Sequence, residues 1–203
     1  MEEPRTKRPI FTPVVLLLLT FSLIGNVFLY TRNLQNAQTD RVDQGTEILQ
    51  SAQTAKAFLA EAEKQAAAMA GAADAAGRMA AKSSLLASYR NASSVTEFIR
   101  EAEDVNGKPF PAAKRSAADF MDQTLASLQA IGNHEGPLTD GEKAYLASLV
   151  QIYQACQKEM SAFQQDAINQ EQALIILVNK DWQPIAGKLL EQMNASADLS
   201  FKG

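Results

Sequence analysis

Hydrophobic and polar positions divide the chain into an uncharged N-terminal run and a series of amphipathic stretches. Residues 10–30 carry no charged side chain. Downstream, apolar residues recur at spacings that alternate between three and four, which is the periodicity of one helix face. No stretch alternates convincingly with a period of two, so no strand is expected. The pattern predicts an all-α protein in which a single N-terminal transmembrane helix precedes an antiparallel four-helix bundle with a short C-terminal helix.

The uncharged run has the length of a membrane span. At a rise of about 1.5 Å per residue, residues 10–30 form roughly 30 Å of helix, which matches the hydrocarbon core of a bilayer. No small-x-small pattern follows the run directly, so an uncleaved signal-anchor is favoured over a cleaved signal peptide. A buried helix of a soluble protein is the remaining alternative.

The flanking charges predict the orientation of this span. Arg5, Lys7 and Arg8 precede it, whereas only Arg32 follows closely. The positive-inside rule then places the N-terminus in the cytoplasm and the rest of the chain outside. The expected segments are a cytoplasmic tail (1–9), a transmembrane anchor (10–30), an extracytoplasmic helical bundle (34–195) and a frayed tail (196–203).

The first stretch after the anchor predicts a long helix with an alanine-rich seam. Small side chains on such a seam let a partner helix approach closely, as in a bundle or a coiled coil. Two glycines, Gly71 and Gly77, predict a break at the end of this helix. The seam positions are Ile48, Ala52, Ala55, Leu59, Ala62, Ala66, Met69 and Ala73.

Three more long helices and a short one are expected downstream. The second long helix carries the apolar positions from Leu85 to Ala102 and ends at the Asn-Gly and the prolines of 104–111. The third covers roughly 111–132, with Gly132 as its C-cap. The fourth continues until the chain nears Pro184, and a short amphipathic piece from Ile185 to Met193 follows. The apolar positions of the fourth helix are Leu149, Ile152, Cys156, Met160, Phe163, Ala167, Leu174 and Leu177.

The start of the fourth helix is the most specific local signal. In "PLTDGEKAYL", Thr139 and Glu142 stand in the relation of a capping box, in which each side chain accepts a backbone amide of the other residue. Asp140 adds a second acid to the first turn, where the helix dipole favours negative charge. The acids are too few and wrongly spaced for a calcium loop. The stretch is therefore interpreted as a helix start and not as a metal site.

Composition excludes several classes of function. The net charge of -4 offers no concentrated basic face for nucleic acid. Cys156 is the only cysteine, so internal disulfides and zinc patterns that need two cysteines are excluded. Cys156 lies on the predicted buried face and is expected to be inert. No nucleophile–base pair is evident, so neither catalytic residues nor a cofactor or metal site is predicted, and the protein is not expected to be an enzyme.

Other conspicuous residues have structural interpretations. His134, the only histidine, is expected to be a solvent-facing turn residue, with pH sensing or ligand contact as the alternative. Trp182 is expected to be a packing anchor, with partner contact as the alternative. Two acidic clusters, Glu61/Glu63 and Glu101/Glu103/Asp104, are interpreted as solvated faces or helix ends.

One stretch resembles a known family. The segment "PLTDGEKAYLASLVQIYQACQKEMSAFQ" (137–164), together with the N-terminal anchor, is similar to the first part of the YpeB-type germination proteins of spore-forming Firmicutes. The resemblance covers the anchor and roughly residues 100–185, without the C-terminal PepSY repeats of that family. The positions that carry it are Pro137, Leu138, Glu142, Leu146, Leu149, Glu159, Met160, Phe163 and Gln164.

The resemblance implies a role in sporulation or germination. Such a protein is a membrane-anchored, non-catalytic accessory or scaffold that supports a cortex-lytic cell-wall hydrolase. The expected partners are the lipid bilayer through residues 10–30, that hydrolase and a second copy in a homodimer. The alternative is an extracytoplasmic four-helix-bundle sensor or ligand-binding module, since bundles of this kind also occur as receptor domains on membrane anchors.

Overall fold

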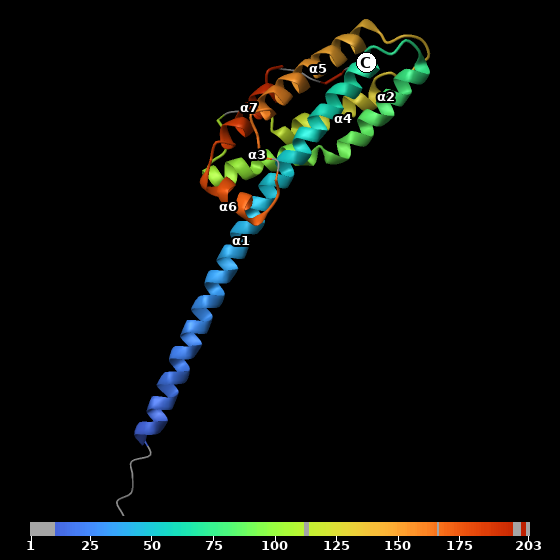
Figure 1. Cartoon of the computed structure of the whole chain (residues 1–203). Coiled ribbons are helices and arrows are strands. Elements are labelled where there is room, and N and C mark those ends of the chain that lie inside the picture. The colour runs from blue at the N-terminus through green and yellow to red at the C-terminus, as the bar shows by residue number, and fades with distance from the viewer. Residues whose placement is uncertain (1–10, 112–113, 166, 197–199, 202–203) are drawn as a thin grey trace, which may run out of the picture. The chain divides into compact units, whose positions relative to one another are not determined.

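The computed structural model describes residues 11–111, 114–165, 167–196 and 200–201 (Figure 1). All regular secondary structure in these ranges is helical, which confirms the predicted all-α class. The predicted tail 1–9 lies outside the described residues. The chain divides into two units, one that ends at Val42 and one that begins at Asp43, and each is described by itself below.

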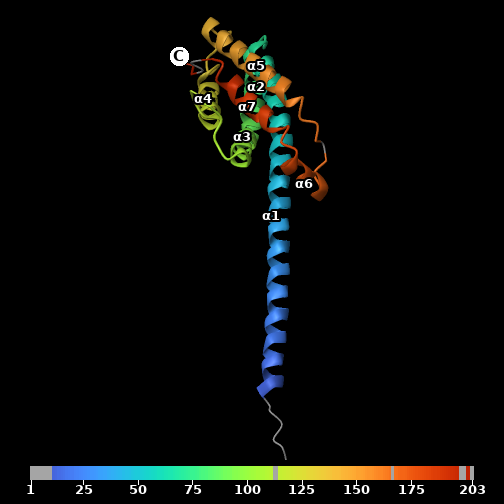
Figure 2. The same ribbon diagram turned by 90° about the vertical axis from the view of Figure 1, so that its left-hand side faces the viewer.

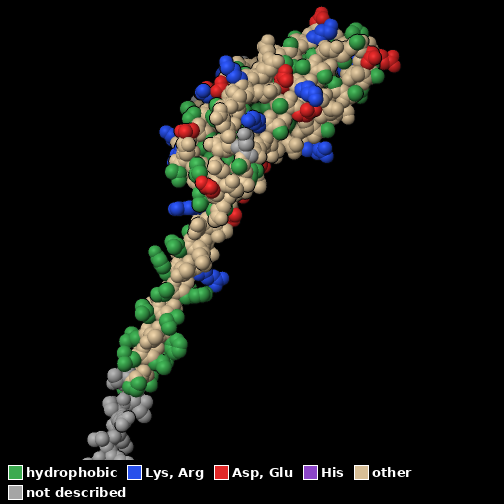
Figure 3. Space-filling model, in the orientation of Figure 1, with side chains coloured by type: hydrophobic (Ala, Val, Ile, Leu, Met, Phe, Trp, Pro, Cys, Tyr) green, Lys and Arg blue, Asp and Glu red, His purple; other side chains and the backbone are tan. Residues whose placement is uncertain are grey.

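The first unit consists of the N-terminal part of helix α1 (Phe11–Ala70). Its large apolar side chains from Phe11 to Leu34 are exposed, except for the half-buried Val15, and hydrophobic side chains are prominent on this segment in Figure 3. Among the described residues, α1 is the one helix long and apolar enough to cross a membrane. The hydroxyls of Thr20 and Thr31 donate to the carbonyls of Leu16 and Val27, so neither hydroxyl needs a water molecule.

The second unit contains the remainder of α1 and six further α-helices, described here for the ranges given above. Helix α7 packs extensively against α3 and α5 and belongs to the core instead of being an appendage. Figure 2 shows α4 and α6 at opposite edges of this unit. The elements are α2 (Ala75–Ser88), the 3₁₀ helix η1 (Tyr89–Asn91), α3 (Ser93–Asn106), α4 (Ala117–Ala130), α5 (Asp140–Met160), α6 (Gln170–Val178) and α7 (Gln183–Met193).

The alanine-rich seam of α1 is buried as predicted. Seven of its eight positions, from Ile48 to Met69, are completely inaccessible to solvent, whereas Ala73 is exposed. Ala73 is exposed because α1 ends at Ala70, so this residue belongs to the predicted break. Asp74 then caps α2 by accepting the amide of Gly77 at 2.7 Å, which places Gly77 inside the helix.

The second predicted helix is interrupted. Its apolar face is buried throughout, but η1 separates α2 from α3 at Tyr89. The Tyr89 hydroxyl hydrogen-bonds that of Tyr153 in α5, so this tighter turn brings two buried polar groups together. Helix α3 ends where predicted, with Gly107 in the left-handed conformation at φ 72°.

The third predicted helix is shorter than expected. It begins at Ala117, because Ser116 and Asp119 form a capping box that fixes the helix start. Its C-cap is Ile131, in an extended conformation, and the predicted C-cap Gly132 lies one residue farther on with φ 71°. The S-x-x-D pattern at 116–119 was a visible signal for this start.

The fourth predicted helix is wrong beyond Met160. The chain leaves the helix at Ser161, and Phe163 then packs edge-to-face on Phe98 with ring centroids 5.7 Å apart. Asn169 starts a separate helix, α6, by accepting the amide of Gln172.

The predicted buried face of this last stretch is also wrong. Ala167 is exposed and Leu174 and Leu177 are only half-buried, whereas Ala173 and Ile176 are fully buried. A new helix has its own rotational phase, so the stripe of α5 cannot be extended into α6.

The predicted frayed tail is ordered at Phe201. Its amide donates to the hydroxyl of Ser127 at 3.0 Å. Its ring lies edge-on to Tyr145, with centroids 6.1 Å apart. The end of the chain is therefore attached to α4 and α5 at this residue.

Candidate functional site

The connection between α4 and α5 contains the predicted capping box. The hydroxyl of Thr139 accepts the amide of Glu142, and the amide of Thr139 donates to Oε2 of Glu142 at 2.8 Å. This confirms the predicted roles of both residues. Glu142 is only 3% exposed, however, and Oε1 also accepts the amide of Gly132 at 2.7 Å. The carboxylate therefore ties the end of the connection to its beginning.

His134 is part of this arrangement, which its sequence position did not suggest. Nε2 lies 2.8 Å from Oε2 of Glu142, and Nδ1 lies 3.0 Å from the carbonyl oxygen of Glu135. His134 is exposed in the connecting turn, as expected, but its ring is also held by the loop, which that expectation did not include. No pattern of residues signals this pair directly, because the loop path between the two residues decides whether they meet.

Two cations of α2 hold the same loop from the other side. The guanidinium of Arg78 donates to the carbonyls of His134 and Gly136, both at 2.6 Å. The ammonium of Lys82 donates to the carbonyls of Gln129 and Ile131 and to the side-chain oxygen of Asn133. Burial lowers the pKa of Lys82, although Glu142 acts in the opposite direction.

The loop network has a structural purpose. Burial alone would raise the pKa of Glu142, but donors from Gly132, His134 and Thr139 outweigh this effect and lower the pKa to about 2. The carboxylate is therefore ionised at neutral pH, and its oxygens are engaged by the loop. The hydrogen bonds of this cluster hold the connection between α4 and α5 in one conformation.

Cys156 and Trp182 are both packed in the interior. The predicted burial of Cys156 is confirmed, and this burial raises the pKa of its thiol to about 12. Trp182 is 2% exposed, and its Nε1 donates to the carbonyl of Ile176 at 3.0 Å. Its ring lies 5.3 Å from that of Phe98. The indole is thus a packing anchor and is not accessible to a partner in this conformation.

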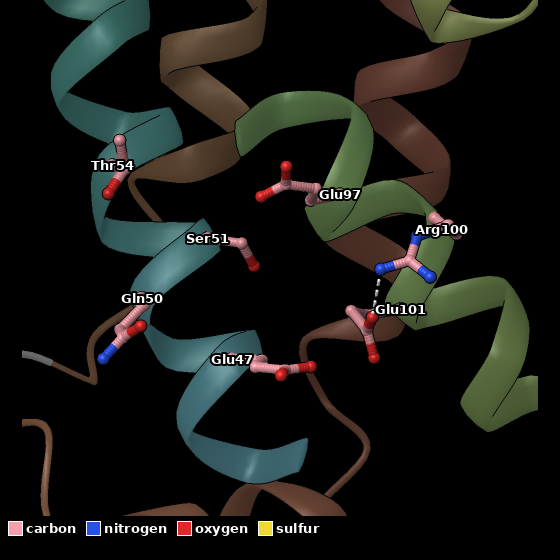
Figure 4. Close-up of a pocket in the computed structure, with 7 residues that line it drawn as sticks. All are labelled: Glu47, Gln50, Ser51, Thr54, Glu97, Arg100 and Glu101. Atoms are coloured by element: carbon pink, nitrogen blue, oxygen red, sulfur yellow. Dashed lines mark hydrogen bonds and ion pairs between the residues drawn. The ribbon is translucent and has the colours of Figure 1, made fainter. Parts of the chain in front are cut away.

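A polar cavity lies between α1 and α3 (Figure 4). Its volume is about 430 Å³. Figure 4 shows lining residues from both α1 and α3 around one open space. The lining residues are Glu47, Gln50, Ser51, Thr54, Glu97, Arg100 and Glu101.

Glu101 is the most unusual residue of this cavity. Its cluster was expected to be a solvated face or a helix end, but Glu101 is only 6% exposed, so a solvated face is wrong for this residue. Its Oε1 accepts Nη2 of Arg100 at 2.8 Å. Burial raises the pKa of Glu101 against the effect of Arg100, and the neighbouring acid Glu47 raises it further. Helix phase carried a signal for this burial, because Glu101 follows the buried Phe98 by three positions.

The cavity suits a positively charged group. Three carboxylates, Glu47, Glu97 and Glu101, face it against one guanidinium, that of Arg100. A ligand ammonium would pair with the excess negative charge and relieve the repulsion among the acids. Among the described residues, no group of three or more histidine, cysteine or acidic side chains has the arrangement of a metal site.

Comparisons with known proteins give no relative. No family model, curated protein or solved structure matches the chain.

Proposed function

We propose that this protein is a membrane-anchored, extracytoplasmic helical protein that acts by binding a partner. The observation that carries the proposal is the exposed apolar surface of α1 from Phe11 to Leu34. In water, a surface of this kind would cost about 25 cal/mol for every Å² exposed, whereas in a bilayer it is the favourable state. The excess of Arg5, Lys7 and Arg8 before the span favours a cytoplasmic N-terminus.

A binding role agrees with how the reactive groups are used. The thiol of Cys156 is buried and protonated at neutral pH. The imidazole of His134 and the carboxylate of Glu142 are engaged with each other and with the loop. Helices that pack around α7 would form the predicted bundle, with α7 as a core member.

The resemblance of residues 137–164 gives the more specific role. In this proposed role, the protein acts during sporulation or germination as an accessory or scaffold that supports a cortex-lytic cell-wall hydrolase. The many exposed polar side chains of α5 and α1 leave a large surface for such a partner.

Anchoring is tested by extraction from membranes. The full chain should resist alkaline extraction, whereas a Leu18→Arg/Ile24→Arg variant should be released. A matched Gln35→Arg/Gln38→Arg variant, altered beyond the exposed apolar stretch, should remain bound. Release of the unaltered chain would contradict the anchor.

The accessory role is tested in a deletion strain. Loss of the protein should lower the level of a cortex-lytic hydrolase in spores, and the two proteins should co-purify from spore membranes. An unchanged hydrolase level would contradict this role and leave the anchor unaffected.

The cavity between α1 and α3 favours a second candidate function, a sensor or ligand-binding module for small cationic molecules. A panel of amines, with spermidine as the first probe, should raise the thermal unfolding midpoint of the chain in detergent. Glu47→Gln should weaken this effect, whereas Glu61→Gln, on another part of α1, should preserve it. A flat response to the panel would contradict the module.

A further inference from the structure

Helix α6 and the loop before it carry an exposed apolar patch. In the second unit, the described residues include only four exposed large hydrophobic side chains, and three of them are Ile168, Ile175 and Val178. Val178 is 83% exposed. Leu174 and Leu177 are half-buried beside them. Two of the three lie on α6, a helix of nine residues, and Ile168 lies in the loop directly before it. Exposed apolar side chains gathered in this way are a candidate interaction surface.

The patch is held rigidly by the second unit. Gly45 of α1 lies so close to α6 that an added Cβ would stand 1.9 Å from the carbonyl oxygen of Ala173. Behind the helix, the indole of Trp182 donates to the carbonyl of Ile176. The apolar face is thus presented outward by a fixed helix instead of by a mobile loop.

The position of this contact in the chain favours one occupant, the lipid bilayer. Gly45 follows Leu34, the last exposed large apolar residue of the first unit, by 11 positions, so the chain between them spans at most about 38 Å in any conformation. A tether of this length raises the effective concentration of lipid at the patch once the anchor crosses a bilayer. We propose that the apolar face of α6 rests in the interfacial layer of the same membrane, a proposal that depends on the anchoring proposed above.

The charges around the patch define the lipid chemistry. Glu171 lies at the start of α6, and Lys180 and Asp181 follow its end, so the described residues that flank α6 form no basic cluster that would select anionic headgroups. Binding is therefore apolar and suits a neutral surface such as phosphatidylcholine. It should change little with salt, in contrast to the attachment of a basic helix.

The test uses the full chain with a reporter at Val178. The native thiol of Cys156 is buried with a pKa of about 12, so neutral-pH labelling selects an introduced cysteine. A Val178→Cys variant labelled with an environment-sensitive dye is reconstituted into phosphatidylcholine vesicles. Spin-labelled lipids should remove most of its fluorescence, and its emission should shift to the blue. Met79→Cys, at the fourth exposed hydrophobic residue and on α2, is the matched control and should show neither effect.

Separate outcomes distinguish this proposal from anchoring. If the labelled chain floats with the vesicles but the dye at position 178 is quenched no more than the dye at 79, the lipid contact of α6 is wrong and the anchor stands. If the chain does not float, the anchor itself is wrong. If two copies of Val178→Cys cross-link efficiently in vesicles at low protein density, the patch is a homodimer surface and the lipid proposal is overturned.

A second variant tests whether apolar contact between α6 and the lipid causes the quenching. Ile175→Glu, added to Val178→Cys, should restore most of the lost fluorescence, because a charged side chain opposes insertion. High salt should leave the quenching unchanged. Quenching that persists in the Ile175→Glu variant would contradict an apolar contact.

Discussion

The imidazole of His134 lies between two oxygen acceptors, with Nε2 2.8 Å from Oε2 of Glu142 and Nδ1 3.0 Å from the carbonyl oxygen of Glu135. A neutral imidazole has one N–H, so only the doubly protonated form can donate to both acceptors. The pair therefore makes the α4–α5 connection sensitive to pH. Two cations of α2 face the same loop: Arg78 opposes the imidazolium but donates to the carbonyl of His134, and Lys82 donates to Asn133.

The contribution of His134 to stability should decrease as pH rises. The carbonyl of Glu135 and the carboxylate of Glu142 raise the pKa of His134 above 6.5 in the folded state. Stability gained from the imidazolium is therefore fully present below pH 6.5 and lost as pH rises through the folded pKa. Thermal unfolding of the chain in detergent, compared with that of His134→Ala between pH 5 and 9, should show a difference that shrinks with pH. A difference that is constant over this range would exclude the effect.

Removal of the Glu142 charge should destabilise the fold. Its Oε1 accepts a hydrogen bond from the amide of Gly132, and its Oε2 accepts one from the amide of Thr139. In Glu142→Gln, an NH₂ group replaces one of these oxygens, so one backbone amide faces another donor and loses its acceptor. We expect a loss of about 2–3 kcal/mol in the free energy of unfolding, on the scale of hydrogen bonds to a charged group. Denaturant unfolding at pH 7 measures the loss, and Glu135→Gln, which changes an exposed neighbouring acid, should have little effect.

The native pKa of Glu142 also predicts the acid behaviour. Because the pKa is lowered to about 2, the stabilisation is complete above pH 4.5 and is lost as pH falls through about 2. In the Glu142→Gln variant this component of acid unfolding should be missing. An unchanged acid transition would mean that the carboxylate is not the group that titrates.

A side chain at position 45 should displace α6. Alanine normally stabilises a helix interior by about 1 kcal/mol relative to glycine, but the Cβ of Gly45→Ala would overlap the backbone of Ala173. We expect a net loss of about 1–3 kcal/mol, typical of overpacking, and a red shift in the emission of Trp182, the only tryptophan. Gly25→Ala, in an open part of the same helix, is the control. A blue-shifted or unchanged spectrum would contradict the close packing.

Replacement of Glu101 should separate stability from binding. Burial raises the pKa of Glu101, so the ionised form is disfavoured in the folded state and Glu101→Gln should raise the unfolding midpoint slightly at pH 7. If the cavity binds cationic ligands, the same variant should respond less to spermidine. If Glu101→Gln lowers the unfolding midpoint, the unfavourable charge of Glu101 in the folded state is contradicted. If spermidine still raises the midpoint of this variant fully, a role of Glu101 in ligand binding is contradicted.

The sequence by itself determined the features that depend on neighbours along the chain. The capping box of Thr139 and Glu142 joins positions three residues apart, and the seam from Ile48 to Met69 follows from helical periodicity. The end of α3 follows from the conformational freedom of Gly107. Each of these features depends on interactions within one helix or one turn, so the pattern of residues is sufficient.

The tertiary structure decided which polar groups meet and which apolar groups remain exposed. His134 reaches Glu142 because cations from α2 hold the loop, and Glu101 is buried because α1 covers its face of α3. Helix α6 takes its phase from the contact between Gly45 and Ala173, which leaves Val178 exposed. These outcomes depend on long-range packing, whose energy is shared among residues far apart in the chain and leaves no local periodic signal.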